Sequence, residues 1–409
     1  MADFIFFLIL AILIFSYLLE RVLSYLNIKN MSPELPKEAE GIYDEEKYKV
    51  SQNYQKESSR FGLISSTFSF LLILLMLIFG GFGLVDQWVR GFSDNPIAIA
   101  LIFFGVLALA SDIISLPFEL YDTFVIEEKF GFNKTTPKTF ILDKVKGYLL
   151  GAIVGGGLLA LITWIYLAAG PLFWLYIWAV VSAFTLLAGM FYASVILPIF
   201  NKLTPLENGP LRSAIEDYAK GVDFKVDNIY IMDGSKRSSK ANAFFSGLGP
   251  NKKIVLFDTL IEKHTTEELV AVLAHEVGHY KKKHTLQGIL LSLLQTGIML
   301  YILSLLIESP ALALALGAME PSFHIGILAF SLLYSPIGLV FGIIMNIVSR
   351  KNEYEADDFA KHTYKSSPLI SALKKLSVDN LSNLSPHPAY VFFHYSHPPL
   401  LKRIDNLKK

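Results

Sequence analysis

The chain contains 409 residues, of which 53% are hydrophobic and only 18% are charged. Soluble domains carry about 25% charged residues, and the apolar residues gather here in long runs, so we expect much of the chain to lie in lipid. The 36 basic and 36 acidic residues balance, which indicates no nucleic-acid partner. Without cysteine, the sequence excludes disulfides, thiolate metal ligands and a cysteine nucleophile.

Seven segments are apolar over the roughly 20 residues that a spanning helix needs. The first lacks the basic start and small-residue cleavage site of a signal peptide, so it is predicted to be a retained span. Gly170-Pro171 separates the fourth and fifth segments, which favours a tight hairpin over one long helix. The segments lie near 3–27, 64–89, 96–120, 148–170, 172–200, 285–307 and 323–349.

The charges of the predicted loops give the segments a direction. Lys and Arg are frequent after spans one, three, five and seven, and almost absent after spans two, four and six, where Arg90 is the exception. Basic loops favour the cytoplasmic side. We therefore expect the amino terminus to lie outside, with the 201–284 segment and the tail after Arg350 in the cytoplasm.

The predicted organisation has four parts. The longest segment between spans carries the catalytic residues, and the tail completes the active site. The parts are 1–200 with spans one to five, 201–284 as the catalytic segment, 285–349 with spans six and seven, and 350–409 as the cytoplasmic tail.

The catalytic segment mixes helix and strand patterns. A helix is expected over Leu211–Lys220, and the β-branched runs Val226–Met232 and Lys253–Phe257 predict strands. A polar loop, Gly234–Asn242, lies between these strands. Thr265 to Glu268 has the spacing of a capping box and predicts the start of another helix.

This last helix carries the motif His-Glu-x-x-His at residues 275–279. Residues four apart share a helix face, so His275 and His279 can bind one ion. A zinc ion with an open position activates water, and Glu276 is placed to take the proton as general base. Chance would give this motif in roughly one such chain in a hundred, and a closed structural site would not need Glu276. We do not expect His284, at the end of this helix, to be a ligand.

The third metal ligand is expected from a distant part of the chain. A polar helix begins where span seven ends, and there Glu353 and Asp357 share a face while Glu355 points away. Glu353 suits a ligand, and Asp357 could accept the far N–H of a ligand histidine. An ordinary solvated helix start is the alternative, and spacing alone leaves the choice open.

Longer motifs add a family resemblance. They are Leu116–Tyr121, Phe124–Asn133, Ser239–Phe244, Lys253–Leu260 and His394–Leu401. With the His-Glu-x-x-His motif, they resemble the type I CAAX prenyl endopeptidases, seven-span zinc proteases that cleave after a prenylated cysteine and remove the last three residues. The match covers most of the chain, and the first and last motifs are the most family-specific.

The resemblance implies a fold and a ligand set. The fold would be mainly α, with seven transmembrane helices enclosing a chamber and a small α+β zincin-like catalytic domain at the cytoplasmic end. Glu353 would be the third zinc ligand, and Asp357 would support a ligand histidine.

The resemblance also implies substrate contacts. An extended substrate would pair with the backbone of Asn242, Ala243 and Phe244 and with Val255 of an edge strand over Lys253–Phe257. His397 and Arg403 would lie beside the zinc and steady the substrate carbonyl or the oxyanion. By itself, His397 before two prolines would be interpreted as a surface turn residue.

We therefore expect a monomeric zinc endopeptidase in a bacterial cytoplasmic membrane or the endoplasmic reticulum. It would hold one Zn²⁺ per chain and cleave C-terminal CAAX tripeptides from prenylated substrates. One alternative is a broad quality-control protease for membrane proteins. A remote alternative is a channel or transporter with structural zinc. The sequence does not favour it, because it shows no broken helices in matched halves of the chain. The polar span residues Asp112, Gln295 and Asn346 are left without a role; Asp112 suits either a chamber lining or a paired structural acid.

Overall fold

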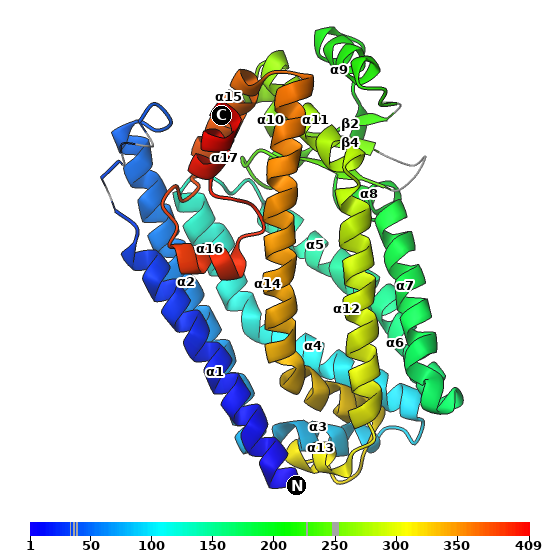
Figure 1. Ribbon diagram of the computed structural model, residues 1–409. Coiled ribbons are helices and arrows are strands. Elements are labelled where there is room, and N and C mark those ends of the chain that lie inside the picture. Colours follow the sequence, from blue (N-terminus) through cyan, green and yellow to red (C-terminus); the bar gives the residue numbers. More distant parts are fainter. Residues whose placement is uncertain (33, 36, 38–39, 226–227, 248–252) are drawn as a thin grey trace.

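The computed structural model describes residues 1–32, 34–35, 37, 40–225, 228–247 and 253–409. Long helices run between the two ends of the molecule, with the amino terminus at one end and the carboxyl terminus and a small sheet at the other (Figure 1). Among these described residues, seven helical segments are long and apolar enough to cross a membrane, as predicted. They are α1 (Ala2–Lys29), α2 (Glu45–Ile78), α4 with η2 (Pro96–Glu127), α5 to α6 (Pro137–Ala168), η4 to α8 (Gly170–Phe200), α12 (His284–Leu306) and α14 (Phe323–Thr363).

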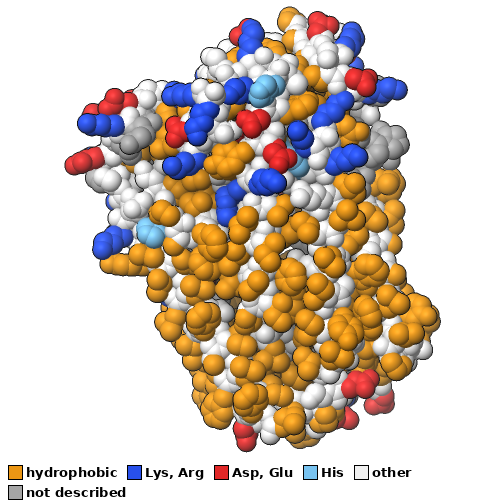
Figure 2. Space-filling view, viewed as in Figure 1, with side chains coloured by type: hydrophobic (Ala, Val, Ile, Leu, Met, Phe, Trp, Pro, Cys, Tyr) orange, Lys and Arg blue, Asp and Glu red, His pale blue; other side chains and the backbone are white. Residues whose placement is uncertain are grey.

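The surface of these helices is covered by apolar side chains (Figure 2). In the same view, Lys and Arg gather at the end that carries the sheet, and acidic groups mark the opposite end. Phe15, Leu75 and Trp164 are among many large apolar residues with about half of their surface exposed. Soluble proteins rarely expose a contiguous apolar surface of this extent, so the chain is a multi-pass membrane protein.

The second span differs from its prediction over 64–89. Helix α2 ends at Ile78, and Gly80 takes a positive φ of 63° before the short helix α3 (Gly81–Arg90). A Cβ on Gly83 would lie 2.0 Å from the carbonyl oxygen of Gly317, so only glycine allows α3 to pack on the turn after α13 (Pro310–Ala315). The apolar run was thus two helices, of which the second closes the end of the molecule.

Two other predicted spans were shorter than the helices that the structure shows. Helix α5 begins at Pro137 with Thr136 as its cap, so the basic residues predicted for a loop lie largely on a helix. There Lys144 Nζ lies 2.7 Å from an oxygen of Asp112 and 2.6 Å from one of Glu119. Asp112 is therefore a paired acid. Helix α14 continues without a break from the membrane to Thr363.

Within the part of the chain that the structure describes, the sheet has four strands in the order β1-β2-β4-β3. Its strands are β1 (Leu203–Pro205), β2 (Ile229–Met232), β3 (Ala243–Ser246) and β4 (Lys253–Phe257). β4 pairs parallel to β2 and antiparallel to β3. The prediction that Lys253–Phe257 is an edge strand is therefore wrong: it lies inside the sheet, and β3 is at the edge. Val226, the predicted start of β2, lies outside the described residues.

Helix α11 (Thr266–Lys281) forms the centre of the domain around the sheet. Ten of its residues are buried, and it packs against α14, the sheet and the other helices of this end. The predicted capping box is present, with Thr265 and Glu268 exchanging hydrogen bonds. The surrounding helices are α9 (Pro210–Gly221), α10 (Asp258–Lys263), α15 (Ser366–Asp379) and α17 (Leu400–Lys408).

The carboxylate of Glu268 joins α11 to α15. It accepts hydrogen bonds from the Thr265 backbone (2.9 Å), Ser371 Oγ (2.6 Å) and Lys375 Nζ (2.7 Å). Burial alone would raise the pKa of Glu268, but these donors outweigh burial and lower the pKa from 4.5 to about 2. The ionised form is thus stabilised in the folded protein.

Replacing Glu268 by Gln should lower the free energy of unfolding by about 1 to 2 kcal/mol at neutral pH, because solvent screens its ion pair with the 42% exposed Lys375. Because the folded pKa is depressed, the wild-type contribution is present above pH 4.5 and is lost as the pH falls toward 2. The free energy of unfolding, measured with urea in detergent micelles, should decrease with falling pH over this range in the wild type but not in the variant. Glu267→Gln, at the exposed residue that precedes Glu268 on α11, should change the free energy of unfolding little. An equal loss of stability in both variants would contradict the assignment.

Candidate metal centre

Helices α11 and α14 bring His275, His279 and Glu353 together. The Nε2 atoms of the two histidines lie 3.1 Å apart. One oxygen of Glu353 lies 3.3 Å from His279 Nε2 and the other 3.5 Å from His275 Nε2. One ligand atom from each residue can thus be chosen so that all lie within 4.8 Å of one another.

Gly278 allows the two helices to approach closely. A Cβ at this position would lie 3.0 Å from Ala356 Cα and 3.1 Å from the Ala356 carbonyl oxygen. Ala356 is fully buried, three residues after Glu353 on the facing helix. A larger residue at 278 would push away the helix that carries Glu353.

The three side chains fit a metal ion. Glu353 Oε2 is buried and has no hydrogen-bond partner among the described residues, although Arg403 Nη1 is 3.2 Å away. Because Arg403 compensates its charge without a hydrogen bond, this oxygen keeps a lone pair free for a metal ion. Two imidazoles and one carboxylate, with room for water, form the ligand set of catalytic zinc sites.

Asp357 lies behind the first histidine, as expected for a group that supports a ligand. Its Oδ1 is 2.9 Å from His275 Nδ1. Arg403 donates to both Asp357 oxygens, at 2.8 and 2.6 Å. Burial lowers the pKa of His275, but the bonds to Asp357 and Glu353 outweigh it and raise this pKa to about 9. The contact with Asp357 thus holds the imidazole in a fixed orientation.

Glu276 faces a cavity of about 180 Å³ beside the two histidines. The cavity is also lined by Asn242, Ala243, His397 and Arg403. Burial raises the pKa of Glu276, while the nearby His275 and His279 act in the opposite direction. A carboxylate with a raised pKa beside a metal-ligand cluster is suited to accept a proton from water.

His397 reaches the same site from the tail. Its Nε2 lies 3.2 Å from Glu353 Oε1, and its Nδ1 is 3.0 Å from Ser396 Oγ. The side chain is 64% exposed, so it borders the cavity without being enclosed. The surface turn suggested by its two following prolines thus stands next to the ligand cluster.

The edge strand β3 leads into this cavity. Asn242 and Ala243 line it, and Phe244 pairs with Val255 in the sheet. Val255 is fully buried, and β4 is paired with a strand on each side. The predicted substrate contact through Val255 is therefore wrong, because its backbone already faces two neighbouring strands.

The loop before β3 is fixed by another family-like motif. Lys240 Nζ lies 2.9 Å from Glu127, at the end of η2. Ser239 donates through its backbone to Phe132 and through its hydroxyl to Gly131, both at 3.0 Å. These contacts hold the start of the edge strand against the third span.

The sequence analysis missed the surroundings of His279. The chain turns at Lys283, which has a positive φ of 60°, and this turn brings His284 back to His279. The two Nδ1 atoms are 3.0 Å apart, and His284 Nε2 lies 3.2 Å from Glu355. If His279 binds metal through Nε2, its Nδ1–H donates to His284, which then donates to Glu355. Only the motif's spacing to His284 could have suggested this, because the contact with Glu355 is between distant segments.

Replacing His284 by Leu should weaken Zn²⁺ binding by about 10- to 100-fold, because His279 loses the acceptor that orients it. Competition between the purified full-length protein and a chromogenic zinc chelator measures this change. His362→Leu, at an exposed histidine near the end of α14, is the matched control and should bind normally. Wild-type affinity in His284→Leu would show that the contact does not support the ligand.

Comparisons with known proteins cover the whole chain. A family model described as "CAAX prenyl protease N-terminal, five membrane helices" matches residues 24–202, and "Peptidase family M48" matches residues 205–409. The CAAX prenyl protease 1 homolog of Oryza sativa subsp. japonica is 36% identical, over 98% of this chain and 96% of its own. CAAX prenyl protease 1 of Saccharomyces cerevisiae is 33% identical, over 95% and 92%.

A solved structure agrees with these matches. The crystal structure of S. mikatae Ste24p superimposes with a TM-score of 0.94 at 33% identity and covers 99% of each chain. Both the fold and the sequence over the full length are thus shared, and the peptidase model includes the His275, His279 and Glu353 cluster. The chain therefore belongs to the CAAX prenyl proteases of peptidase family M48 and is a multi-pass membrane metalloendopeptidase.

Proposed function

We propose that this metalloendopeptidase uses one Zn²⁺ per chain to remove the last three residues of prenylated CAAX substrates. One observation carries the proposal: His275, His279 and Glu353 converge beside Glu276 in a cavity bordered by an open strand edge. The names of the relatives supply the CAAX substrate class. A metal that activates water and an edge that grips a peptide are what hydrolysis of an extended chain requires.

His275, His279 and Glu353 would hold the zinc. When bound, the ion would lower the pKa of water and polarise the scissile carbonyl. Glu276 would accept the proton of the attacking water and return it to the leaving amine. Asp357 would keep His275 oriented with its Nε2 toward the site, since it accepts from Nδ1.

Arg403 and His397 would act on the substrate carbonyl. Arg403 is held by Asp357 and directs another guanidinium nitrogen toward Glu353. His397 lies at the open side of the same carboxylate. Both groups line the cavity, and there they would stabilise the negative charge that develops on the carbonyl oxygen.

The peptide would lie along β3. This strand lines the 180 Å³ cavity at Ala243 and a second cavity, of about 540 Å³, at Phe245 and Ser246. Glu276 borders both cavities, so a chain paired with β3 would pass the general base. The larger cavity is bordered by Tyr192, Leu286 and Ile289, which suit apolar side chains. The enclosed chamber that the resemblance implies stays a prediction.

The active site would face the cytoplasm, with the amino terminus outside. The support is the charge distribution, since basic residues gather at the end that carries the sheet and cytoplasmic surfaces favour Lys and Arg. We further propose a monomer in a bacterial cytoplasmic membrane or the endoplasmic reticulum. Membership of a peptidase family leaves the channel hypothesis without an observation in its favour.

Replacing Glu276 by Gln should leave zinc binding intact and reduce peptidase turnover by about 10²- to 10⁴-fold, because the proton acceptor is lost. Zinc content and cleavage are measured on the same preparation. Glu267→Gln, on the exposed side of α11, should cleave at the wild-type rate. Normal turnover in Glu276→Gln would sink the mechanism, whereas loss of zinc would assign Glu276 to the ligand set.

Substrate class is tested with two matched peptides, one farnesylated at a C-terminal CAAX cysteine and one not, each with and without a zinc chelator. We expect chelator-sensitive release of the last three residues from the farnesylated peptide only. Similar rates for both peptides would keep the metal mechanism and favour broad proteolysis of membrane proteins. Release that resists complete removal of the metal would contradict the metalloprotease assignment itself.

A further inference from the structure

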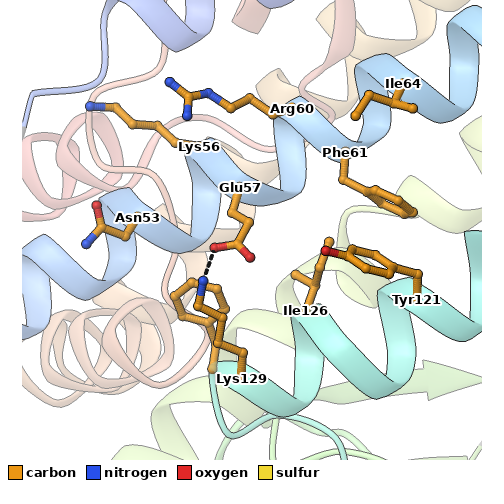
Figure 3. Close-up of a pocket in the computed structure, with 10 residues that line it drawn as sticks. Asn53, Lys56, Glu57, Arg60, Phe61, Ile64, Tyr121, Ile126 and Lys129 are labelled. Carbon is orange, nitrogen blue, oxygen red and sulfur yellow. Dashed lines mark hydrogen bonds and ion pairs between the residues drawn. The ribbon is translucent and has the colours of Figure 1, made fainter.

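A groove of about 720 Å³ lies between α2 and the end of the third span, away from the metal centre (Figure 3). None of the residues that line it belongs to the candidate site. One part of it is polar and basic, and the part on the right of Figure 3 is apolar. The side chains that matter are Lys56, Arg60, Phe61 and Ile64 of α2, with Tyr121 and Lys129 opposite.

The groove carries an excess of positive charge. Lys129 is paired with Glu57 at 2.6 Å, as the dashed line in Figure 3 shows. Lys56 and Arg60 have no ion-pair or hydrogen-bond partner within the described part of the chain. Three cations therefore face one carboxylate, and the two unpaired ones lie one helical turn apart.

The apolar part of the groove continues along a single face of α2. The rings of Phe61 and Tyr121 stack with centroids 4.9 Å apart. Ile64 is 62% exposed. It begins a row of exposed apolar residues that are spaced three or four apart and therefore share one face of α2. This row continues with Phe68, Leu71, Leu75 and Ile78.

The groove also lies at the membrane boundary. Residues 61–78 of α2 contain no charged side chain, whereas Lys56, Glu57 and Arg60 stand just before this run. The opposite face of α2 is turned to the protein, where Leu77 is buried and Ile73 packs against the same core cluster. The groove therefore opens toward lipid on the face of α2 that bears the large apolar residues.

We propose that this groove binds one anionic phospholipid, with its phosphate between Lys56 and Arg60 and an acyl chain along Ile64, Phe68 and Leu71. Basic pockets between membrane helices at the cytoplasmic surface recognise anionic headgroups, and the apolar row supplies the site for the chain. A free phosphate would use only the basic part. The bound lipid would hold α2 against the end of η2, from which Glu127 contacts the loop before β3.

The test uses full-length protein in detergent micelles, titrated with dioctanoyl phosphatidylglycerol, dioctanoyl phosphatidylcholine or glycerol 3-phosphate. Native mass spectrometry counts retained lipid, and the thermal unfolding midpoint reports stabilisation. Lys56→Glu/Arg60→Glu reverses the charge of the groove. Lys47→Glu/Lys49→Glu makes the same change of charge on exposed residues of the same helix outside the groove, and Ile64→Asn changes the apolar part only.

The expected result is one retained phosphatidylglycerol per chain, with affinity at least about tenfold lower in Lys56→Glu/Arg60→Glu and within twofold of wild type in Lys47→Glu/Lys49→Glu. Ile64→Asn should weaken the lipid but leave the weak binding of glycerol 3-phosphate unchanged. Retained cleavage by each variant verifies its fold. Equal weakening in both charge variants would reduce the effect to general surface attraction and overturn the proposal. Binding of phosphatidylcholine or glycerol 3-phosphate as tight as that of phosphatidylglycerol would overturn it as well.

Discussion

The metal centre depends on one helix contact, the close approach of α11 and α14 at Gly278. The two helices come from parts of the chain about 80 residues apart, and α14 continues directly from a membrane span. Because a Cβ at position 278 would press on the backbone of Ala356, the contact tolerates only hydrogen there without a shift of some tenths of an ångström. The distance from Glu353 to the histidines is thus limited by the close packing of the two main chains.

Burying two carboxylates at this contact is possible only with compensating charge. Glu353 and Asp357 lie on one face of α14, and Arg403 of α17 reaches both. Removing the guanidinium would leave two like charges close together in a buried site, an arrangement that destabilises proteins by several kcal/mol. The last helix of the chain is therefore part of the metal centre, although no local pattern in its sequence indicates this.

Local patterns predicted what local chemistry determines. Apolar runs gave seven spans, and the capping box and the spacing of His275 and His279 gave α11. The break at Gly80, the position of β3 at the sheet edge and the contact between His284 and Glu355 were missed. The first and last of these depend on partners far along the chain, Gly317 and helix α14, and the edge position of β3 depends on the pairing of β4 with two strands at once. Hydrophobic periodicity along the sequence cannot predict such contacts between separate segments.

The continuous helix α14 also places Glu353 just beyond the apolar surface of the molecule. Its apolar run ends at Arg350, whose guanidinium donates to the carbonyls of Val391 and Tyr395 and so holds the segment that leads to His397. Glu353 follows three residues later, about 5 Å further along the axis. A substrate anchored in the bilayer by an apolar group would therefore present the adjoining peptide at the height of the metal ligands. Under the proposed function, the depth at which the apolar group is anchored would thus select the bond that reaches Glu276.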